Sequence, residues 1–116
     1  MRFLVVAILC FFWVCPVQAK HKHHEKYYQE KHCQGTLEYK LPDRTRVDCL
    51  TDEYAIEFEF ASKWAEAVGQ SLYYGLKTSK KPMIALIVES VQDLRYINRV
   101  REICDMYGIT LWIIEE

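Results

Sequence analysis

The stretch that most constrains the fold is the apolar run MIALIV, residues 83–88. An uninterrupted apolar run of this length is typical of a β-strand that is buried on both faces. Segments with helical spacing of apolar residues lie on either side of it. Their apolar positions are Trp64, Val68 and Leu72 before the run, and Leu94, Ile97, Val100, Ile103 and Cys104 after it. Together these segments predict crossover units in which helices cover a parallel sheet.

Alternation of polar and apolar residues predicts three more strands in the first half of the chain, over residues 36–41, 44–50 and 54–61. A polar helix is expected before them, over residues 24–33, and a last strand over residues 109–114. The expected order is α-β-β-β-α-β-α-β. This order predicts an α/β fold with a mixed central sheet flanked by helices, in which an antiparallel hairpin leads into parallel crossover units.

The first 19 residues have the pattern of a secretory signal peptide, with a basic Arg2, an apolar run over residues 3–14, and Ala19 at the cleavage position. The run is shorter than the roughly 20 residues that a membrane-spanning helix needs. We therefore expect cleavage after Ala19, which leaves one domain of residues 20–116 that is periplasmic or secreted and has no membrane attachment. An uncleaved amino-terminal anchor is the alternative.

Charge and cysteine content limit the classes of function. The formal net charge is −1, and −2 once Arg2 is removed, whereas nucleic-acid binders usually carry a basic surplus. Any phosphate binding must therefore come from local basic residues, for which the candidates are Arg44, Arg46, Lys80 and Lys81. The predicted mature chain keeps three cysteines, Cys33, Cys49 and Cys104. Their odd number allows at most one disulfide, and the lack of CxxC spacing argues against a cysteine zinc site.

Three carboxylates, Asp48, Glu57 and Glu59, occupy predicted strands, where acids are usually depleted. If Asp52-Glu53 is a two-residue hairpin loop, Asp48 lies directly opposite Glu57, and alternation puts Glu59 on the same face as Glu57. Cys49 then faces the other way, where a buried thiol is expected. Carboxylates held together in a partly buried cleft become protonated unless a cation lies among them, and oxygen ligands suit Mg²⁺, Mn²⁺ or Ca²⁺. The alternative is that each acid is a solvated polar residue on an exposed face.

Histidines near the predicted amino terminus of the mature chain offer a second metal hypothesis. His21, His23 and His24 could bind Zn²⁺ or Cu²⁺ through neutral imidazole, which would make the chain a periplasmic metal-binding protein. The alternative is a solvated polar tail.

The acids, the helix that follows them and the order of elements resemble the PD-(D/E)XK nuclease superfamily, and the resemblance covers most of residues 20–116. It implies a restriction-endonuclease-like core in which Asp48 is the first acid and Glu57 the second. Glu59 stands where most members have lysine, and Lys63 in the next helix is a candidate replacement. Gln70 and Tyr74 resemble the QxxxY motif of RecB-type members. An acid from the first helix is also implied, with Glu30 as the candidate and Glu25 as the reserve.

The resemblance implies a nuclease that hydrolyses phosphodiester bonds, with DNA as the expected substrate and Mg²⁺ or Mn²⁺ as cofactor. Asp48, Glu57 and Glu59 would bind the metal with help from Glu30, while Lys63, Gln70 and Tyr74 would complete the catalytic set. A homodimer or a protein partner is also expected for a nuclease of this size. The alternative is a catalytically inactive binding module of the same fold, which the missing strand lysine and the acidic net charge favour.

Overall fold

A computed structural model describes residues 21–116, so the predicted signal peptide lies outside the described residues. The elements are α1 (Glu25–His32), β1 (Thr36–Lys40), β2 (Arg46–Leu50), β3 (Tyr54–Phe60), α2 (Trp64–Thr78), β4 (Lys81–Val88), α3 (Leu94–Tyr107) and β5 (Thr110–Glu115). Short 3₁₀ turns, η1 (Ala61–Lys63) and η2 (Val91–Asp93), lead into α2 and α3. The described residues thus follow the predicted order of elements.

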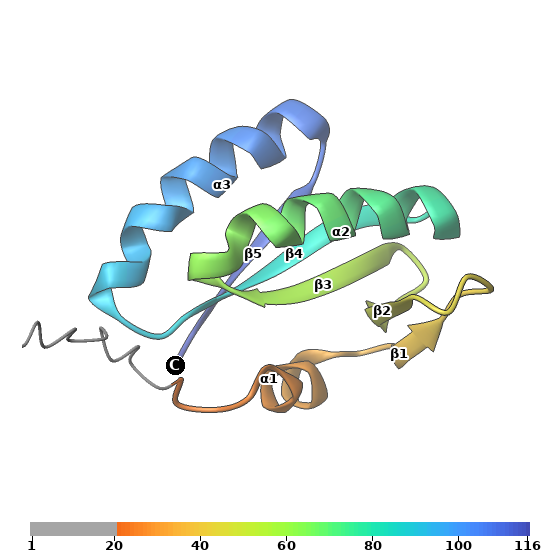
Figure 1. Cartoon of the computed structure of the whole chain (residues 1–116), viewed down its shortest axis with the longest axis horizontal. Helices are drawn as coiled ribbons and strands as arrows, with labels where there is room; N and C mark the ends of the chain where they lie inside the picture. Colours follow the sequence, from red (N-terminus) through yellow and green to blue (C-terminus); the bar gives the residue numbers. More distant parts are fainter. Residues whose placement is uncertain (1–20) are drawn as a thin grey trace, which may run out of the picture.

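The strands form one five-stranded sheet in the order β1-β2-β3-β4-β5. The β1–β2 and β2–β3 pairs are antiparallel, whereas β3–β4 and β4–β5 are parallel. In Figure 1, α2 and α3 lie on one side of the sheet and α1 on the other. The prediction of a mixed α/β fold with helices flanking a central sheet is confirmed.

Each side of the sheet has its own apolar cluster, because alternate residues of β3 and β4 point to opposite faces. Phe58 and Ile87 pack with Tyr28 of α1 on one face, while Ile84 and Leu86 pack with α2 and α3 on the other. The central part of β4 is therefore buried on both sides, as its unbroken apolar run predicts. Within residues 21–116, no helix is both long and apolar enough to cross a bilayer.

The hairpin between β2 and β3 has the predicted register. Cys49 pairs with Ile56 and Leu50 with Ala55, and the Thr51 N–H donates to the Tyr54 carbonyl across the Asp52-Glu53 loop at 2.9 Å. This register places Asp48 and Glu57 opposite one another.

One cysteine prediction is wrong. Cys49 does face away from Asp48, but it forms a disulfide with Cys33 instead of remaining a buried thiol, while Cys104 is a free, buried cysteine. The sequence allowed one disulfide without giving its partners. Alternation alone does not reveal that the chain after α1 returns to β2.

Gly35 explains how the chain after α1 reaches β2. The first helix ends at His32 with Cys33 as its cap, one residue before its predicted end. A Cβ atom at Gly35 would lie 2.1 Å from the carbonyl oxygen of Leu50, so any side chain there would collide with the β2 backbone. Glycine thus permits a close approach between this segment and the strand.

Candidate functional site

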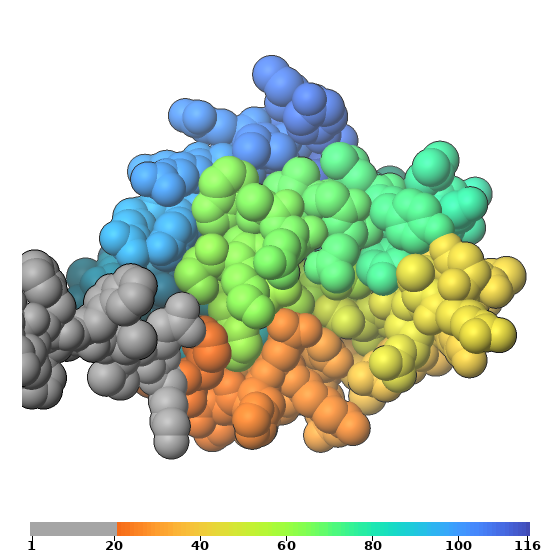
Figure 2. All heavy atoms as spheres, in the orientation of Figure 1, coloured from red at the N-terminus to blue at the C-terminus, as the bar shows by residue number. Residues whose placement is uncertain are grey.

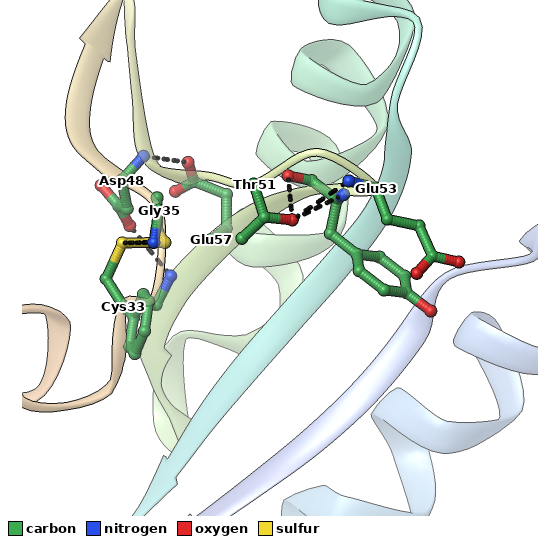
Figure 3. Close-up of a disulfide and its surroundings, with 9 residues drawn as sticks. Cys33, Gly35, Asp48, Thr51, Glu53 and Glu57 are labelled. Atoms are coloured by element: carbon green, nitrogen blue, oxygen red, sulfur yellow. Dashed lines mark hydrogen bonds between the residues drawn. A yellow bond between two sulfur atoms is a disulfide. The ribbon is translucent and has the colours of Figure 1, made fainter.

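The candidate site lies where β2 and β3 separate. Within residues 21–116, the backbones of these two strands pair only at Cys49–Ile56 and Leu50–Ala55. At the next position, backbone N–H groups donate to acidic side chains instead of to the backbone of the opposite strand. The Asp48 N–H donates to Oε1 of Glu57 at 3.4 Å, and the Phe58 N–H donates to Oδ2 of Asp48 at 2.9 Å. The two carboxyl groups therefore lie in the fork between the strands, and Figure 3 shows Asp48 facing Glu57 there.

Burial makes this pair hold a proton. Glu57 is only 3% exposed, and Asp48 is half-buried. Burial, followed by the charge of Asp48, raises the pKa of Glu57 to about 10, and burial raises the pKa of Asp48 to about 6. The hydrogen bond between the two carboxyl groups raises the pKa of Glu57 and lowers that of Asp48. Near neutral pH, Glu57 therefore remains protonated and donates a hydrogen bond to the Asp48 carboxylate.

A second carboxyl pair joins β3 to α1. Glu59 is 7% exposed, and its Oε1 accepts a hydrogen bond from the Phe60 N–H at 3.0 Å. Burial, followed by the charge of Glu25, raises the pKa of Glu59 to about 7. Burial, followed by the charge of Asp48, also raises the pKa of Glu25, which hydrogen-bonds to Glu59. The four residues Glu25, Asp48, Glu57 and Glu59 are called the carboxylate cluster below.

Lys63 provides positive charge beside this cluster. It lies at the N-cap of α2, is exposed, and lowers the pKa of both Glu25 and Glu59 through its charge. Lys63 lowers each pKa by less than burial raises it, so the pKa values of Glu25 and Glu59 both remain raised. In the space-filling view the orange atoms of α1 lie against the green atoms that follow β3, where η1 and α2 begin (Figure 2).

The acid contributed by α1 is Glu25, whereas the first candidate from the sequence was Glu30. Glu30 is exposed and lies 3.9 Å from Lys26 in an ion pair on the outer side of the helix. The buried face of α1 is set by Tyr28 and Gln29, and Gln29 Nε2 donates to Glu25 at 3.1 Å. Too few apolar residues occur in α1 to fix this helical phase from the sequence.

The two residues of the QxxxY pattern occupy different environments. Gln70 is exposed on α2. Tyr74 is 7% exposed and packs with Leu41, Val47 and Ala55. Burial, followed by the charge of Glu57, raises the pKa of Tyr74. Tyr74 thus packs on the sheet beside the cluster, while Gln70 is free to meet a ligand.

The basic candidates divide into two groups. Arg44 lies in the turn before β2 and Arg46 is the first residue of that strand, where its guanidinium is 3.5 Å from Glu38. Lys80 and Lys81 lie at the other end of β3, because Lys81 pairs with Tyr54 in the sheet register. There, Lys81 forms a 2.9 Å ion pair with Glu53, and Lys80 donates to the Asp52 carbonyl at 2.5 Å. The arginines are therefore better placed than the lysines to meet a ligand at the cluster.

Glu38 is a nearby acid that sequence reasoning missed. It lies between Leu37 and Tyr39, which pair with Cys49 and Val47, so it is level with Asp48 on the neighbouring strand. The φ of Glu38 is 48°, a left-handed conformation that is uncommon for a residue with a side chain. The charge of Glu38 raises the pKa of Asp48, although less than burial and the charge of Glu59 do. A predicted register for the β1–β2 hairpin would have found it.

The arrangement of the side-chain donors decides which metal ions the cluster could hold. Among residues 21–116, no three His, Cys, Asp or Glu side chains are grouped so as to hold a metal ion. The cluster instead consists of two hydrogen-bonded carboxyl pairs. Mg²⁺ commonly uses one or two carboxylates and completes its shell with water and substrate oxygens, so the donor chemistry of the Asp48–Glu57 pair fits this ion.

The predicted histidine cluster is divided among other contacts. The ring of His21 stacks on Phe60 at 3.5 Å and its Nδ1 lies 2.5 Å from Glu89, whereas the ring of His23 stacks on Tyr27 at 3.8 Å. These rings are therefore held apart from one another.

A cavity of about 830 Å³ lies away from the carboxylate cluster. Its lining includes His32, Thr51, Tyr54, Lys80 and Trp112, and none of the four clustered carboxyl groups. This cavity is therefore separate from the carboxylate cluster.

Comparison with known proteins gives one match to report. A protein named "Putative KilA-N domain-containing protein R878", from Acanthamoeba polyphaga mimivirus, is 34% identical to this chain over 96 residues. The match covers 81% of this chain but 24% of the viral protein, so the chain spans about a quarter of the relative's length. No protein-family model matches the chain, and no solved structure matches it.

These comparisons correct the family assignment made from the sequence. The resemblance to the PD-(D/E)XK superfamily is wrong as a statement of kinship, because the matching relative is named for KilA-N, which is a different family. The restriction-endonuclease-like core is likewise not established, although the mixed α/β sheet is. Two acids on one strand and one on its neighbour are too short a pattern to identify a family.

Proposed function

We propose that this protein binds DNA and hydrolyses phosphodiester bonds with the help of a divalent cation, Mg²⁺ or Mn²⁺, at the carboxylate cluster. The observation that carries the proposal is the buried Asp48–Glu57 pair in the strand fork. Its carboxyl groups occupy a place where apolar residues would stabilise a sheet better, and both have raised pKa values. Clustered carboxyl groups with raised pKa values are typical of functional sites.

The roles follow from where each side chain lies. Asp48 and Glu57 would hold the cation, which replaces their shared proton. Such an ion polarises a phosphoryl oxygen and lowers the pKa of the attacking water. Glu59, whose pKa of about 7 results mainly from burial, can accept a proton from water near neutral pH. Glu25 and Lys63 set the charge around Glu59.

The proposed substrate contacts come from the exposed residues around the cluster. Arg44 and Arg46 would bind phosphate oxygens where β2 begins, and Gln70 would orient a phosphate or a water from α2. The arginines compensate locally for an overall charge that is close to neutral. A homodimer or protein partner is part of the proposal, since a chain of this size offers a short nucleic-acid contact surface.

The name of the viral relative supports DNA as the partner. KilA-N denotes a DNA-binding family, and the shared segment covers most of this chain. It also favours a second candidate function, a DNA-binding module without catalysis. The division of the carboxyl groups into two pairs is a further observation in favour of this candidate.

One comparison distinguishes the two functions. Residues 20–116 are purified in the oxidised state and incubated with supercoiled plasmid or linear single-stranded DNA, in Mg²⁺, in Mn²⁺ and in chelator. The hydrolase predicts metal-dependent nicking that Asp48→Ala/Glu57→Ala abolishes, while the exposed control Glu102→Gln retains it. Binding of DNA without cleavage under all conditions contradicts the hydrolase and supports the binding module.

We also propose that the protein is exported, to the periplasm or out of the cell. The Cys33–Cys49 disulfide supports this location, because structural disulfides persist mainly in oxidising compartments. Amino-terminal sequencing of the protein recovered outside the cytoplasm tests the proposal and predicts Lys20 as the first residue. A first residue of Met1 in a cytoplasmic fraction would contradict it.

A further inference from the structure

The disulfide joins two elements that each contribute to the carboxylate cluster. Cys33 is the residue directly after α1, which carries Glu25, and Cys49 directly follows Asp48 on β2. Figure 3 shows the disulfide beside the Asp48–Glu57 pair. A single covalent bond thus joins the helix that supplies one acid to the strand that supplies another.

The helix α1 is short, and Tyr28 is its one side chain in the apolar cluster on that face of the sheet. It has eight residues, of which Tyr28 and Gln29 are buried, and no side chain caps its amino terminus. A helix of this length is not stable by itself, because isolated helices shorter than about 12–15 residues are marginal in water. Its remaining polar anchors include a 3.1 Å hydrogen bond from Tyr28 to Glu89 and an exposed ion pair between Lys31 and Glu116.

The segment after α1 is built around the disulfide. The Cys33 N–H donates to the Gln29 carbonyl at 2.9 Å, which closes the last turn of the helix. The Gly35 N–H then approaches Sγ of Cys33 at 3.4 Å, in the segment where a Cβ would collide with Leu50. The segment after the helix is therefore in direct contact with the β2 backbone at Gly35, two residues after Cys33.

We infer that the Cys33–Cys49 disulfide positions α1 so that Glu25 reaches Glu59, and that the carboxylate cluster is complete only in the oxidised protein. This inference rests on the proposed function and concerns the regulation of the same site. A chain that acquired the disulfide only on export would be inactive in the reducing cytoplasm where it is made.

The redox step is a two-electron thiol–disulfide exchange. On oxidation, each thiol loses one proton and one electron to a disulfide oxidant, which leaves as a dithiol, and the Cys33–Cys49 bond forms. A dithiol reductant reverses the step, and its thiolate attacks the half-buried Cys33 because Cys49 is fully buried. No metal ion takes part in this exchange.

The test compares amide hydrogen exchange in the oxidised protein with that in Cys33→Ala/Cys49→Val, whose side chains keep the apolar packing. We expect the amides of α1 to exchange about tenfold faster or more in the variant through local opening, while those of β4 remain the slowest to exchange. The matched control is Lys31→Ala, which removes another anchor of α1 and leaves the disulfide intact. It should retain slow exchange in α1.

Calorimetric titration with Mn²⁺ gives a second readout. The variant should bind Mn²⁺ about tenfold more weakly than the oxidised protein, since supporting contacts commonly contribute this much to metal affinity. Unchanged exchange in α1 would overturn the inference. Exchange of the α1 amides as slow as that of the β4 amides in the variant would also overturn it, because the helix would then open only when the whole fold unfolds.

Failure of the proposed function is distinguishable from failure of the inference. If the oxidised protein binds no Mn²⁺ and cleaves no DNA, the hydrolase proposal fails, while the exchange of α1 still decides whether the disulfide positions the helix. If the oxidised protein and the variant bind Mn²⁺ equally, the inference fails and the hydrolase proposal stands.

Discussion

The two sides of β3 are built differently. Towards β4, the backbones pair at every residue from Tyr54 to Phe60, and alternate side chains of β4 enter the two apolar clusters. Towards β2, pairing is recorded at two positions, after which Asp48 and Glu57 occupy the space between the strands. The parallel side stabilises the sheet. On the antiparallel side, hydrogen bonds to carboxyl groups replace some of the backbone hydrogen bonds between the strands. One strand thus contributes to both the core and the candidate site.

The largest expected effect concerns the parallel side. Leu86 is fully buried beneath α2 and α3, and Leu86→Ala should lower the free energy of unfolding by about 3–4 kcal/mol because it leaves a cavity. Urea denaturation followed by tryptophan fluorescence measures the change. A loss below about 1 kcal/mol would show that this side does not carry the stability of the sheet.

Reduction of the disulfide should have the next largest effect. The bond links residues 16 positions apart, and a loop of this length stabilises a fold by about 3 kcal/mol, mainly by restricting the unfolded chain. Urea denaturation of the reduced and oxidised proteins measures the difference. Lys31→Ala should cost less than about 1 kcal/mol, because exposed ion pairs contribute little. Equal stability of the two redox states would contradict the account.

In the fork, a conservative change should stabilise the protein. Glu57→Gln keeps an oxygen that can accept from the Asp48 N–H but removes a carboxyl group whose ionisation burial opposes. In metal-free buffer at pH 8 we expect the free energy of unfolding to rise by about 1 kcal/mol. Glu102→Gln, on the exposed surface of α3, is the matched control and should change it by less than about 0.5 kcal/mol. Destabilisation by Glu57→Gln would mean that the acid supports the fold.

The last effect is the pH dependence of the stability of the metal-free protein. Burial raises the pKa of Glu59 to about 7 and that of Asp48 to about 6, so the folded state holds more protons than the unfolded state between about pH 4 and pH 7. The resulting stabilisation is complete below the unfolded pKa values and is lost as pH rises through the folded ones. The melting temperature should therefore fall between pH 5 and pH 8. Glu59→Gln should reduce that fall, and an equal fall in the variant would contradict the assignment.

Sequence patterns predicted the parts of this molecule that depend on neighbouring residues. The unbroken apolar run of β4 and the alternation in β3 gave the sheet and placed Glu57 and Glu59 on one face. The hairpin loop at Asp52-Glu53 gave the correct register because its length alone fixes which residues face each other.

What the sequence did not give depends on contacts between distant segments. The phase of α1 is set by Tyr28 packing under the sheet, so Glu25 and not Glu30 reaches the cluster. The partners of the disulfide depend on the close approach at Gly35. The family could not be inferred from the acids, because carboxylates at this spacing can arise on any sheet that opens in the same way.

Calorimetric titration of oxidised residues 20–116 with Mn²⁺ tests the central claim most directly, namely that the Asp48–Glu57 pair exchanges its shared proton for a divalent cation. The account predicts one bound ion per chain, proton release that depends on the buffer, and loss of both in Asp48→Asn/Glu57→Gln but not in Glu102→Gln. Absence of binding by the unaltered protein, or equal binding by the double variant, would contradict it.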